Sequence, residues 1–283
     1  MKTLMFYSYK GGSGRTVAAA NVSVALAKLG CRVAIIDLDF EAPGLQYVFR
    51  LHAAKRYHDA TGIQHYLRGD SSIASLFKDG AFDLFREVDP FRFFTIPESA
   101  TLLYLAACRN VVQVDAQDPR VEQRTRELLA HLQDEKAIDF LILDAASGVR
   151  DAYSIAAEVT DEMLMFFRWS RQHVEGTLQM VHWLSEIRRF GERSFPCKLV
   201  ASASPAPSDL DGLPEGLQHE LVELRNNTRN RINEALREAE MEPGEIFFDI
   251  PEMRDLKWSE GVMVLENKNS PFEALAAQLR QGP

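Results

Sequence analysis

The chain has few cysteines, no long hydrophobic run and no excess of basic residues. Its 283 residues include 3 cysteines, which are too few and too scattered for a disulfide framework or a cysteine-rich zinc site. The longest apolar runs, such as Phe140–Leu143, are far shorter than the roughly 20 residues needed to cross a bilayer. The segment Met1–Tyr9 lacks the apolar stretch and cleavage site of a signal peptide. We therefore expect a cytoplasmic protein with reduced thiols and no membrane association.

Acidic residues outnumber basic ones. The chain has 41 Asp and Glu against 32 Lys and Arg, and a net charge of -9 at pH 7. This balance excludes a generally basic nucleic-acid-binding protein, although a local basic patch is still compatible with it. Hydrophobic residues make up 46% of the chain and charged residues 26%, which are the proportions of a globular protein with a sizeable core.

Strand-like and helix-like segments alternate along the chain. The run Leu4–Tyr9 predicts a strand that leads into a glycine-rich loop, and Thr16–Leu29 predicts a helix. Arg32–Ile36 is apolar on both faces, as a buried parallel strand is. Further strands are expected at Leu102–Ala107, Phe140–Leu143, Met163–Phe167, Lys198–Ala203 and Ile246–Ile250, and further helices at about 120–135, 172–190, 215–240 and 271–280. The alternation predicts an α/β fold with a doubly wound, mostly parallel sheet and helices on both faces.

We expect residues 1–283 to form one domain, because no internal repeat, low-complexity tract or clear linker divides them. Residues 50–100 are rich in phenylalanine and show no clear period. They are predicted to form an irregular elaboration beside the sheet rather than a separate domain. The proline-containing segment Ser208–Gly216 is predicted to be a loop or a small insertion.

The glycine-rich segment Tyr9–Thr16, with the sequence YKGGSGRT, is the first strong chemical signal. Glycines let a backbone curl so that its N–H groups point inward, and the N-terminus of the helix that follows favours an anion. The standard phosphate-binding loop is G-x-x-x-x-G-K-[ST]. Here Tyr9 stands at the first glycine position and Arg15 at the lysine position, while Thr16 keeps the hydroxyl that can bind Mg²⁺. Taken alone, the segment is also compatible with a glycine turn that binds nothing.

This segment resembles the deviant Walker A motif, K-G-G-x-G-K-[ST], of the ParA/MinD family of ATPases, in a K-G-G-x-G-R variant. Arg15 departs from the motif, because a guanidinium is larger than an ammonium and planar. The resemblance implies that Mg-ATP is the ligand, with backbone N–H groups around its phosphates and Arg15 at the β- and γ-oxygens. It also implies a nucleotide-sandwich homodimer in which Lys10 reaches the ATP of the other copy. The nucleotide-binding residues that it implies in this loop are Gly11, Gly12, Ser13, Gly14, Arg15, Thr16 and Val17.

Two later segments resemble the switch regions of the same family. The first, Val33–Asp39, is similar to the strand that enters switch I, and the second, Asp139–Gly148, is similar to Walker B followed by switch II. Because hard cations prefer oxygen ligands, the resemblance assigns Thr16, Asp37 and Asp144 to Mg²⁺. It assigns Asp39 to the attacking water, Gly148 to closure on the γ-phosphate and Pro251 to the base. Any one of these aspartates alone could be a solvated strand end or a helix cap, but the three together in this order favour the site.

The resemblance implies an ATPase that dimerises with ATP and couples its nucleotide state to a protein partner. An alternative is a nucleotide-loaded scaffold that does not hydrolyse ATP, because Arg15 replaces the Walker lysine. A bacterial tyrosine kinase is less favoured, since the last tyrosine is Tyr153, far from the C-terminus. A dinucleotide-binding protein is less favoured, since Val17 stands where G-x-G-x-x-G has its third glycine.

Binding to nonspecific DNA or to a membrane surface leaves weaker signals in the sequence. A basic group suggests a DNA-binding surface; its members are Arg188, Arg189, Arg193 and Lys198. The C-terminal stretch Pro271–Pro283 contains a single basic residue, Arg280, and is a poor candidate for a membrane-surface helix.

Overall fold

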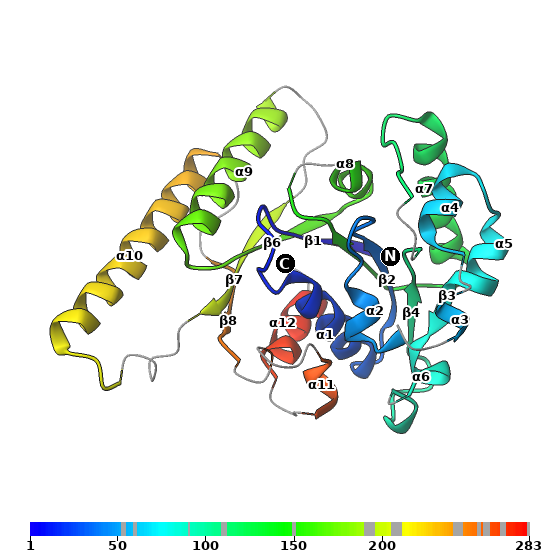
Figure 1. The fold of residues 1–283 in the computed structure, drawn as a ribbon, viewed down its shortest axis with the longest axis horizontal. Coiled ribbons are helices and arrows are strands. Elements are labelled where there is room, and N and C mark those ends of the chain that lie inside the picture. The colour runs from blue at the N-terminus through cyan, green and yellow to red at the C-terminus, as the bar shows by residue number, and fades with distance from the viewer. Residues whose placement is uncertain are drawn as a thin grey trace.

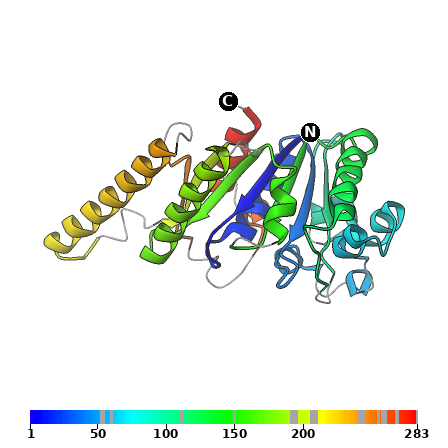
Figure 2. The same cartoon turned by 90° about the horizontal axis from the view of Figure 1, so that it is seen from above.

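The described strands form one eight-stranded sheet in the order β3-β4-β2-β5-β1-β6-β7-β8 (Figures 1 and 2). This computed structural model describes residues 1–51, 55–58, 61–89, 91–108, 112–148, 151–189, 196–204, 211–239, 246–253, 256, 261–266 and 270–281. The strands are β1 (Lys2–Tyr7), β2 (Arg32–Leu38), β3 (Ala81–Asp83), β4 (Thr101–Leu105), β5 (Phe140–Ala145), β6 (Glu162–Phe167), β7 (Cys197–Ser204) and β8 (Phe248–Pro251). Neighbouring strands are parallel except for β3 and β4, which are antiparallel. The predicted α/β class with a mostly parallel sheet is confirmed.

Helices cover both faces of this sheet (Figure 1). The first face packs against α1 (Arg15–Lys28), α2 (Leu45–Val48), α6 (Leu84–Glu87), α11 (Met263–Glu266) and α12 (Pro271–Gln281). The second face packs against α4 (Ile63–Arg68), α7 (Pro119–Ala130), α8 (Asp151–Ala157), α9 (Arg171–Arg189) and α10 (Glu215–Glu238). The remaining short helical elements are α3 (Lys55–His58), α5 (Ile73–Ser75), two π-helical turns at 76–80 and 131–135 and a 3₁₀ turn at 91–93.

Alternate side chains of each central strand belong to different cores. In β5, Ile142 packs on the α1 face, whereas Leu141 and Leu143 pack on the opposite face. All of these residues are buried, because a parallel sheet in this class of fold is covered on both faces. The same alternation places Asp144, two residues after Ile142, on the α1 face at the end of its strand.

Helix α1 is almost entirely enclosed. Its alanine-rich sequence lets it lie close to the sheet, and buried residues occur all round the helix rather than on one stripe. The helix starts after Gly14 and ends before Gly30, and both glycines have positive φ angles, of 77° and 92°. Because α1 follows β1 directly, its N-terminus lies at the edge of the sheet where the parallel strands end, which we call the carboxyl edge.

The region 50–100 is more regular than predicted. Its described residues form short helices and the strand β3, which extends the sheet beyond β4. Several of its aromatic residues belong to the core, including Phe82, Phe85 and Phe91. The prediction of an irregular segment was wrong in this respect, because elements of three to six residues are too short to show a hydrophobic period. Of the predicted loop at 208–216, residues 211–214 are a non-helical turn before α10, residues 215 and 216 belong to α10, and residues 208–210 lie outside the described part.

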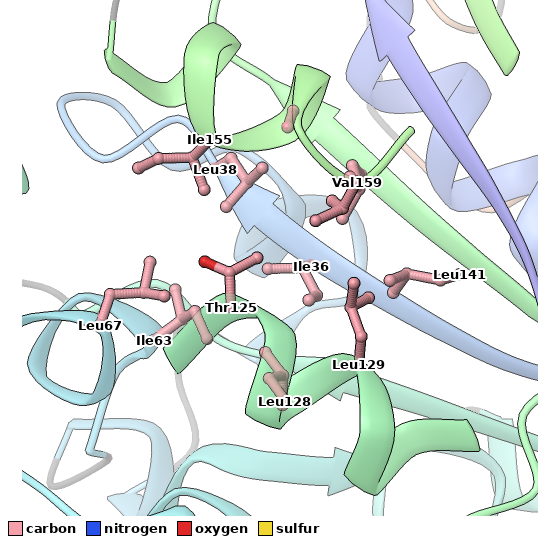
Figure 3. Close-up of a pocket in the computed structure, with 12 residues that line it drawn as sticks. Ile36, Leu38, Ile63, Leu67, Thr125, Leu128, Leu129, Leu141, Ile155 and Val159 are labelled. Carbon is pink, nitrogen blue, oxygen red and sulfur yellow. The ribbon is translucent and has the colours of Figure 1, made fainter. Parts of the chain in front are cut away.

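An apolar pocket lies under α7 and α8 (Figure 3). Ile36 and Leu38 of β2 point into it, together with Leu141 and Leu143 of β5. The intervening residues Asp37 and Ile142 therefore face the other side of the sheet. A more polar cleft of about 740 Å³ adjoins this pocket and is lined by residues of α7, α8 and the start of β1. Neither cavity is lined by a residue of the predicted site.

Candidate functional site

The predicted phosphate, switch and metal residues come from three neighbouring strands. β5 lies between β2 and β1 in the sheet, and all three run parallel. The segments that follow them therefore meet at the carboxyl edge, where ligands bind in open α/β sheets. The register is close, since Asp37 of β2 is the direct partner of Asp144 of β5. Phe6 of β1 pairs with the same Asp144 from the other side.

The loop between β1 and α1 has the backbone form that its glycines predict. Gly12 and Gly14 have φ angles of 75° and 77°. A Cβ atom at either position would meet nothing within 4 Å, so conformation rather than space requires glycine there. Ser13 between them is buried, whereas both glycines are exposed. No side chain caps α1 and its first turn holds no acidic residue, which leaves this helix end suited to an anion.

Arg15 turns its guanidinium inward. Its Nε donates a hydrogen bond to Asp144 Oδ1 at 2.7 Å, and one of its terminal nitrogens donates to Ser8 Oγ at 3.3 Å. A second terminal nitrogen lies 3.8 Å from Asp39 Oδ2. The Arg15 side chain is only 8% exposed and that of Asp144 is 0% exposed, so solvent screens this ion pair little. Arg15 is thus the counter-ion of the carboxylates at this edge.

Asp37 and Asp144 form a fully buried pair of carboxyl groups. Burial, and then the neighbouring Asp144, raise the pKa of Asp37 well above its usual range. Backbone N–H groups of Asp39 and Leu45 donate to the two oxygens of Asp37, at 3.0 and 3.1 Å, and oppose that rise in its pKa. Burial also raises the pKa of Asp144, against the effects of Arg15 and of the Thr16 hydroxyl.

The segment after β2 is folded back onto the start of α1. Asp39, half-buried, accepts a hydrogen bond from the backbone of Ala42 at 3.1 Å, which makes a tight turn of this segment. Gly44 lies so close to α1 that a Cβ atom there would be 3.0 Å from Thr16 Cγ2. A larger residue would therefore press on the residue predicted to bind Mg²⁺.

The residues present fit a divalent cation that arrives with further ligands. Asp144 Oδ2 is buried and has no hydrogen-bond partner in the described structure. Three carboxyl groups, those of Asp37, Asp39 and Asp144, lie at this edge, and one guanidinium lies within 4 Å of Asp39 and Asp144, so cationic charge is in deficit. Among the described residues, no group of three or more His, Cys, Asp and Glu side chains could hold a metal by itself. The remaining ligands would have to come from Thr16 and from a bound phosphate.

Lys10 is exposed beside α9. Its Nζ lies 5.7 Å from the centre of the Tyr9 ring. Tyr9 in turn packs on the backbone of α9, where a Cβ atom at Gly176 would lie 2.2 Å from Tyr9 Cδ1. Burial, and then the charges of Arg168 and Lys10, lower the pKa of the nearby His173. Lys10 and Arg168, with His173 near them, form a basic patch at the carboxyl edge, next to the glycine loop.

Strand β7 supports the glycine loop from the other side. The Ser202 hydroxyl lies within hydrogen-bonding distance of the Ser13 carbonyl and of the Phe167 carbonyl. The contact with Ser13 ties the buried centre of the loop to the sheet. Pro251, predicted to contact the base, is exposed at the end of β8. β8 is three strands away from β1, or about 14 Å at the usual strand spacing, so the structure does not bring Pro251 to the phosphate loop.

Two further residues that were predicted to bind the nucleotide, Val17 and Gly148, lie close to the glycine loop. Val17 lies in the first turn of α1 and packs against the core. Gly148 has a φ angle of 78° and donates its N–H to the Ser8 carbonyl at 3.3 Å. The segment after β5 therefore touches the base of the glycine loop.

Sequence reasoning missed Ser8, Ser147 and Ser202 as parts of the site. Ser8 joins Arg15 and Gly148, and a Cβ atom at Gly11 would lie 3.9 Å from Ser147 Oγ. The signal available in the sequence was their position, because each serine stands within two residues of the end of a strand that leads to the carboxyl edge.

The basic group predicted to bind DNA is only partly visible. Lys198 is engaged with Glu162, its Nζ lying 2.6 Å from a carboxylate oxygen. Arg193 and the side chains of Arg188 and Arg189 lie outside the described residues. Across the described part of the chain, no helix is both long and apolar enough to cross a membrane.

A family model described as the CobQ/CobB/MinD/ParA nucleotide binding domain matches residues 4–189 of this chain. The match includes the glycine loop, both aspartate-bearing strands and the whole of α9. The chain belongs to this nucleotide-binding family. Its sheet with helices on both faces is the ParA/MinD type of P-loop NTPase fold.

This chain is distantly similar to a MinD protein from Bacillus. It is 25% identical over 164 residues to the septum site-determining protein MinD of Bacillus subtilis (strain 168), with 58% of this chain and 52% of MinD covered. The chain thus spans about half the length of the curated relatives it matches.

Two solved structures share its fold over nearly the whole length. The MinC:MinD cell division protein complex of Aquifex aeolicus has a TM-score of 0.66 at 18% identity, covering 100% of this chain and 97% of that chain. MinD of Pyrococcus horikoshii OT3, complexed with Mg-ADP, has a TM-score of 0.61 at 16% identity, covering 98% and 95%.

Proposed function

We propose that this chain is an ATPase switch that dimerises with ATP and couples its nucleotide state to a protein partner. The observation that carries the proposal is the convergence of the glycine loop, Asp37 and Asp144 at one edge, with an exposed lysine beside them. Family membership supports a nucleotide as the ligand. The Mg-ADP bound by the Pyrococcus MinD supports an adenine nucleotide with magnesium.

In the proposed mechanism the glycine loop binds the phosphates through its backbone. N–H groups from Gly11 to Thr16 and the helix end of α1 face an anion, and fixed dipoles of this kind need no reorganisation. Thr16, Asp37 and Asp144 would hold Mg²⁺, which neutralises phosphate charge when bound. Asp39 would orient the attacking water, a role for which its half-exposed position at the turn is suited.

In this mechanism the carboxylates of the site and the phosphates of the nucleotide compete for Arg15. Its guanidinium neutralises Asp144 and approaches Asp39 in the present structure. To reach the β- and γ-oxygens of a nucleotide, the guanidinium must leave at least part of this network. We expect this exchange to slow turnover more than it weakens binding, because a bound cation takes over the charge of Asp144.

Lys10 completes the proposed dimer. Its ammonium is exposed and lies outside the ion pairs that hold Arg15. A cation supplied to the phosphates by a second copy stabilises the charge that develops in phosphoryl transfer, as an arginine finger does. Loss of the γ-phosphate would relax the segments after β2 and β5 and separate the copies. The Aquifex MinC:MinD complex supports a protein as the kind of partner that reads this state.

Phosphate release from Mg-ATP tests the proposal directly. Wild-type protein and Lys10→Ala are compared over a range of protein concentrations, with nucleotide binding measured separately. We expect turnover that rises more than linearly with wild-type concentration and collapses in Lys10→Ala, while both proteins bind ATP. Equal turnover and equal ATP-dependent dimerisation in the two proteins would falsify the proposed role of Lys10. Binding without turnover in either protein would leave a nucleotide-loaded scaffold.

A further inference from the structure

The first part of α10 carries four exposed apolar side chains, three of which form a stripe. Leu217, Leu221, Val222 and Leu224 are 42%, 38%, 45% and 63% exposed. They make up half of the large hydrophobic residues that are exposed in the described part of the chain, and all lie within eight positions of one helix. A clustered apolar surface of this kind on a soluble protein marks an interaction site. We call residues 215–224 the α10 overhang.

The overhang lies beyond the carboxyl edge of the sheet. Arg225 directly follows this segment, and its guanidinium pairs with Asp249 of β8 at 2.7 Å and covers the Trp169 ring. Asp249 and Trp169 both stand near the ends of parallel strands. The ten residues before Arg225 therefore extend about 15 Å further on the same side as the glycine loop. Both ribbon views show this yellow end of α10 reaching past the tip of β7 (Figures 1 and 2).

The apolar stripe continues the side of α10 that faces the body of the protein. Leu217, Leu221 and Leu224 follow the helical spacing that leads through Thr228 to the buried Ile232 and Leu236, whereas Val222 lies on another side of the helix. The stripe thus points toward the space in front of the carboxyl edge rather than away from the molecule. A second protein molecule bound at that edge would therefore contact the apolar side of the overhang.

The charges of the overhang complement the carboxyl edge itself. The overhang has three glutamates, Glu215, Glu220 and Glu223, and no lysine or arginine. The exposed cations of the edge include Lys10, Arg168 and Arg171. Opposite charges of this kind favour the edge of a second copy and disfavour nucleic acid and anionic lipid.

The apolar surface of the overhang is too small to hold a stable interface by itself. A stable interface buries about 800 Å² on each partner, which four partly exposed aliphatic side chains cannot supply. The stripe therefore fits a contact that is added to a larger interface. The dimer proposed above places such an interface at the adjacent edge.

We infer that the α10 overhang of each copy packs against the basic carboxyl edge of the other copy in the ATP-bound dimer. This inference rests on the proposed function, because only a dimer joined at that edge brings a second copy under the stripe. It gives the dimer a contact that does not involve the nucleotide. Removing that contact weakens dimerisation and leaves the nucleotide site of each copy intact.

The test compares Leu221→Glu/Leu224→Glu with the wild type in sedimentation velocity experiments with Mg-ATP. We expect the dimer dissociation constant to rise at least tenfold, while ATP binding and the melting temperature of the monomer stay unchanged. Leu29→Glu is the matched control, since Leu29 is 37% exposed at the far end of α1, at the opposite edge of the sheet. It should dimerise like the wild type.

A photo-crosslinker at position 224 identifies the neighbour directly. The Leu224→Cys variant is labelled with benzophenone maleimide, and crosslinks between isotopically distinct copies are mapped. We expect intermolecular crosslinks near Lys10 or Arg171 that require Mg-ATP. Crosslinks within one chain alone, or a double glutamate variant that dimerises as tightly as the wild type, would overturn the inference and leave the proposed dimer standing. Wild-type protein that binds ATP and stays monomeric would overturn both.

Discussion

Arg15 Nε donates to Asp144 Oδ1 at 2.7 Å and so joins the first residue of α1 to the end of β5. The residue that stands at the Walker lysine position is therefore held by the aspartate that ends the neighbouring strand. Both side chains are shielded from solvent, and the guanidinium also approaches Asp39. This arrangement gives Arg15 a role in holding the protein together as well as a proposed role toward phosphate.

Arg15→Ala should lower the free energy of unfolding by about 3 kcal/mol, because the mutation leaves buried carboxylates without their counter-ion. Urea denaturation in the absence of nucleotide and magnesium measures the effect. Arg15→Lys is the conservative variant and should lose less, since an ammonium keeps the charge but not the planar set of donors.

A double-mutant cycle with Asp144→Asn separates the ion pair from other effects of the substitution. The double variant should be more stable than the sum of the two single losses predicts, because each single change leaves the other group unpaired. Additive losses would show that Arg15 and Asp144 do not depend on one another. The same variants, tested for Mg-ATP affinity, report whether the guanidinium also contributes to binding.

Ser202→Ala should weaken Mg-ATP binding roughly fivefold, which corresponds to about 1 kcal/mol for one hydrogen bond. The change removes the hydroxyl next to the Ser13 carbonyl and loosens the buried centre of the glycine loop. Isothermal titration calorimetry measures the dissociation constant. The matched control is Ser204→Ala, whose hydroxyl accepts a hydrogen bond from Trp169 Nε1 at 2.7 Å. Equal losses in both variants would point to a general effect on β7 instead.

Much of the fold could be predicted because its central strands are short but nearly continuous apolar runs. The strands β2, β5 and β6 are buried along almost their whole length, and most of their residues are apolar. The helix α1 is bounded by glycines. The strand β3 and helices such as α8 could not be predicted in the same way. Their hydrophobic residues are set by contacts with distant parts of the chain, so no local period reveals them.

The site was predictable in its residue types and order but not in its contacts. Asp37 and Asp144 are far apart in sequence, and only the parallel register of β2 and β5 makes them direct partners. The inward turn of Arg15 depends on the ends of these strands, because its guanidinium pairs with Asp144 and approaches Asp39. Sequence similarity placed Arg15 at the phosphates and had no means of including this competition.

The pKa of His173 predicts a loss of stability on acidification. Burial and the charges of Arg168 and Lys10 lower that pKa in the folded state, so the unfolded chain takes up a proton first as the pH falls. The free energy of unfolding should therefore decrease as the pH drops below the unfolded value of about 6.5. Urea denaturation at pH 7.5 and at pH 5.5 measures the decrease.

The variant His173→Gln should show a smaller decrease between these two pH values than the wild type. His182→Gln, on an exposed position of the same helix, is the control and should keep the wild-type decrease. If His173→Gln loses as much stability as the wild type on acidification, the basic surroundings of His173 do not affect folding.

Gly176→Ala should impair ATP-dependent dimerisation and turnover while leaving ATP binding within about twofold of the wild type. A Cβ atom at this position would lie 2.2 Å from Tyr9 Cδ1, so the Tyr9 ring must move, and Lys10 beside it moves too. The backbone that follows Lys10 keeps its own support from Ser202 and Gly148, which protects phosphate binding. Gly216→Ala is the control for the effect of a helical alanine on stability, because nothing lies within 4 Å of its added Cβ atom. That control should gain up to about 0.5–1 kcal/mol of stability from the better helix former, and its dimerisation is left out of the comparison because Gly216 belongs to the α10 overhang. If Gly176→Ala shows the same gain and also dimerises normally, the position of Tyr9 has no bearing on the dimer.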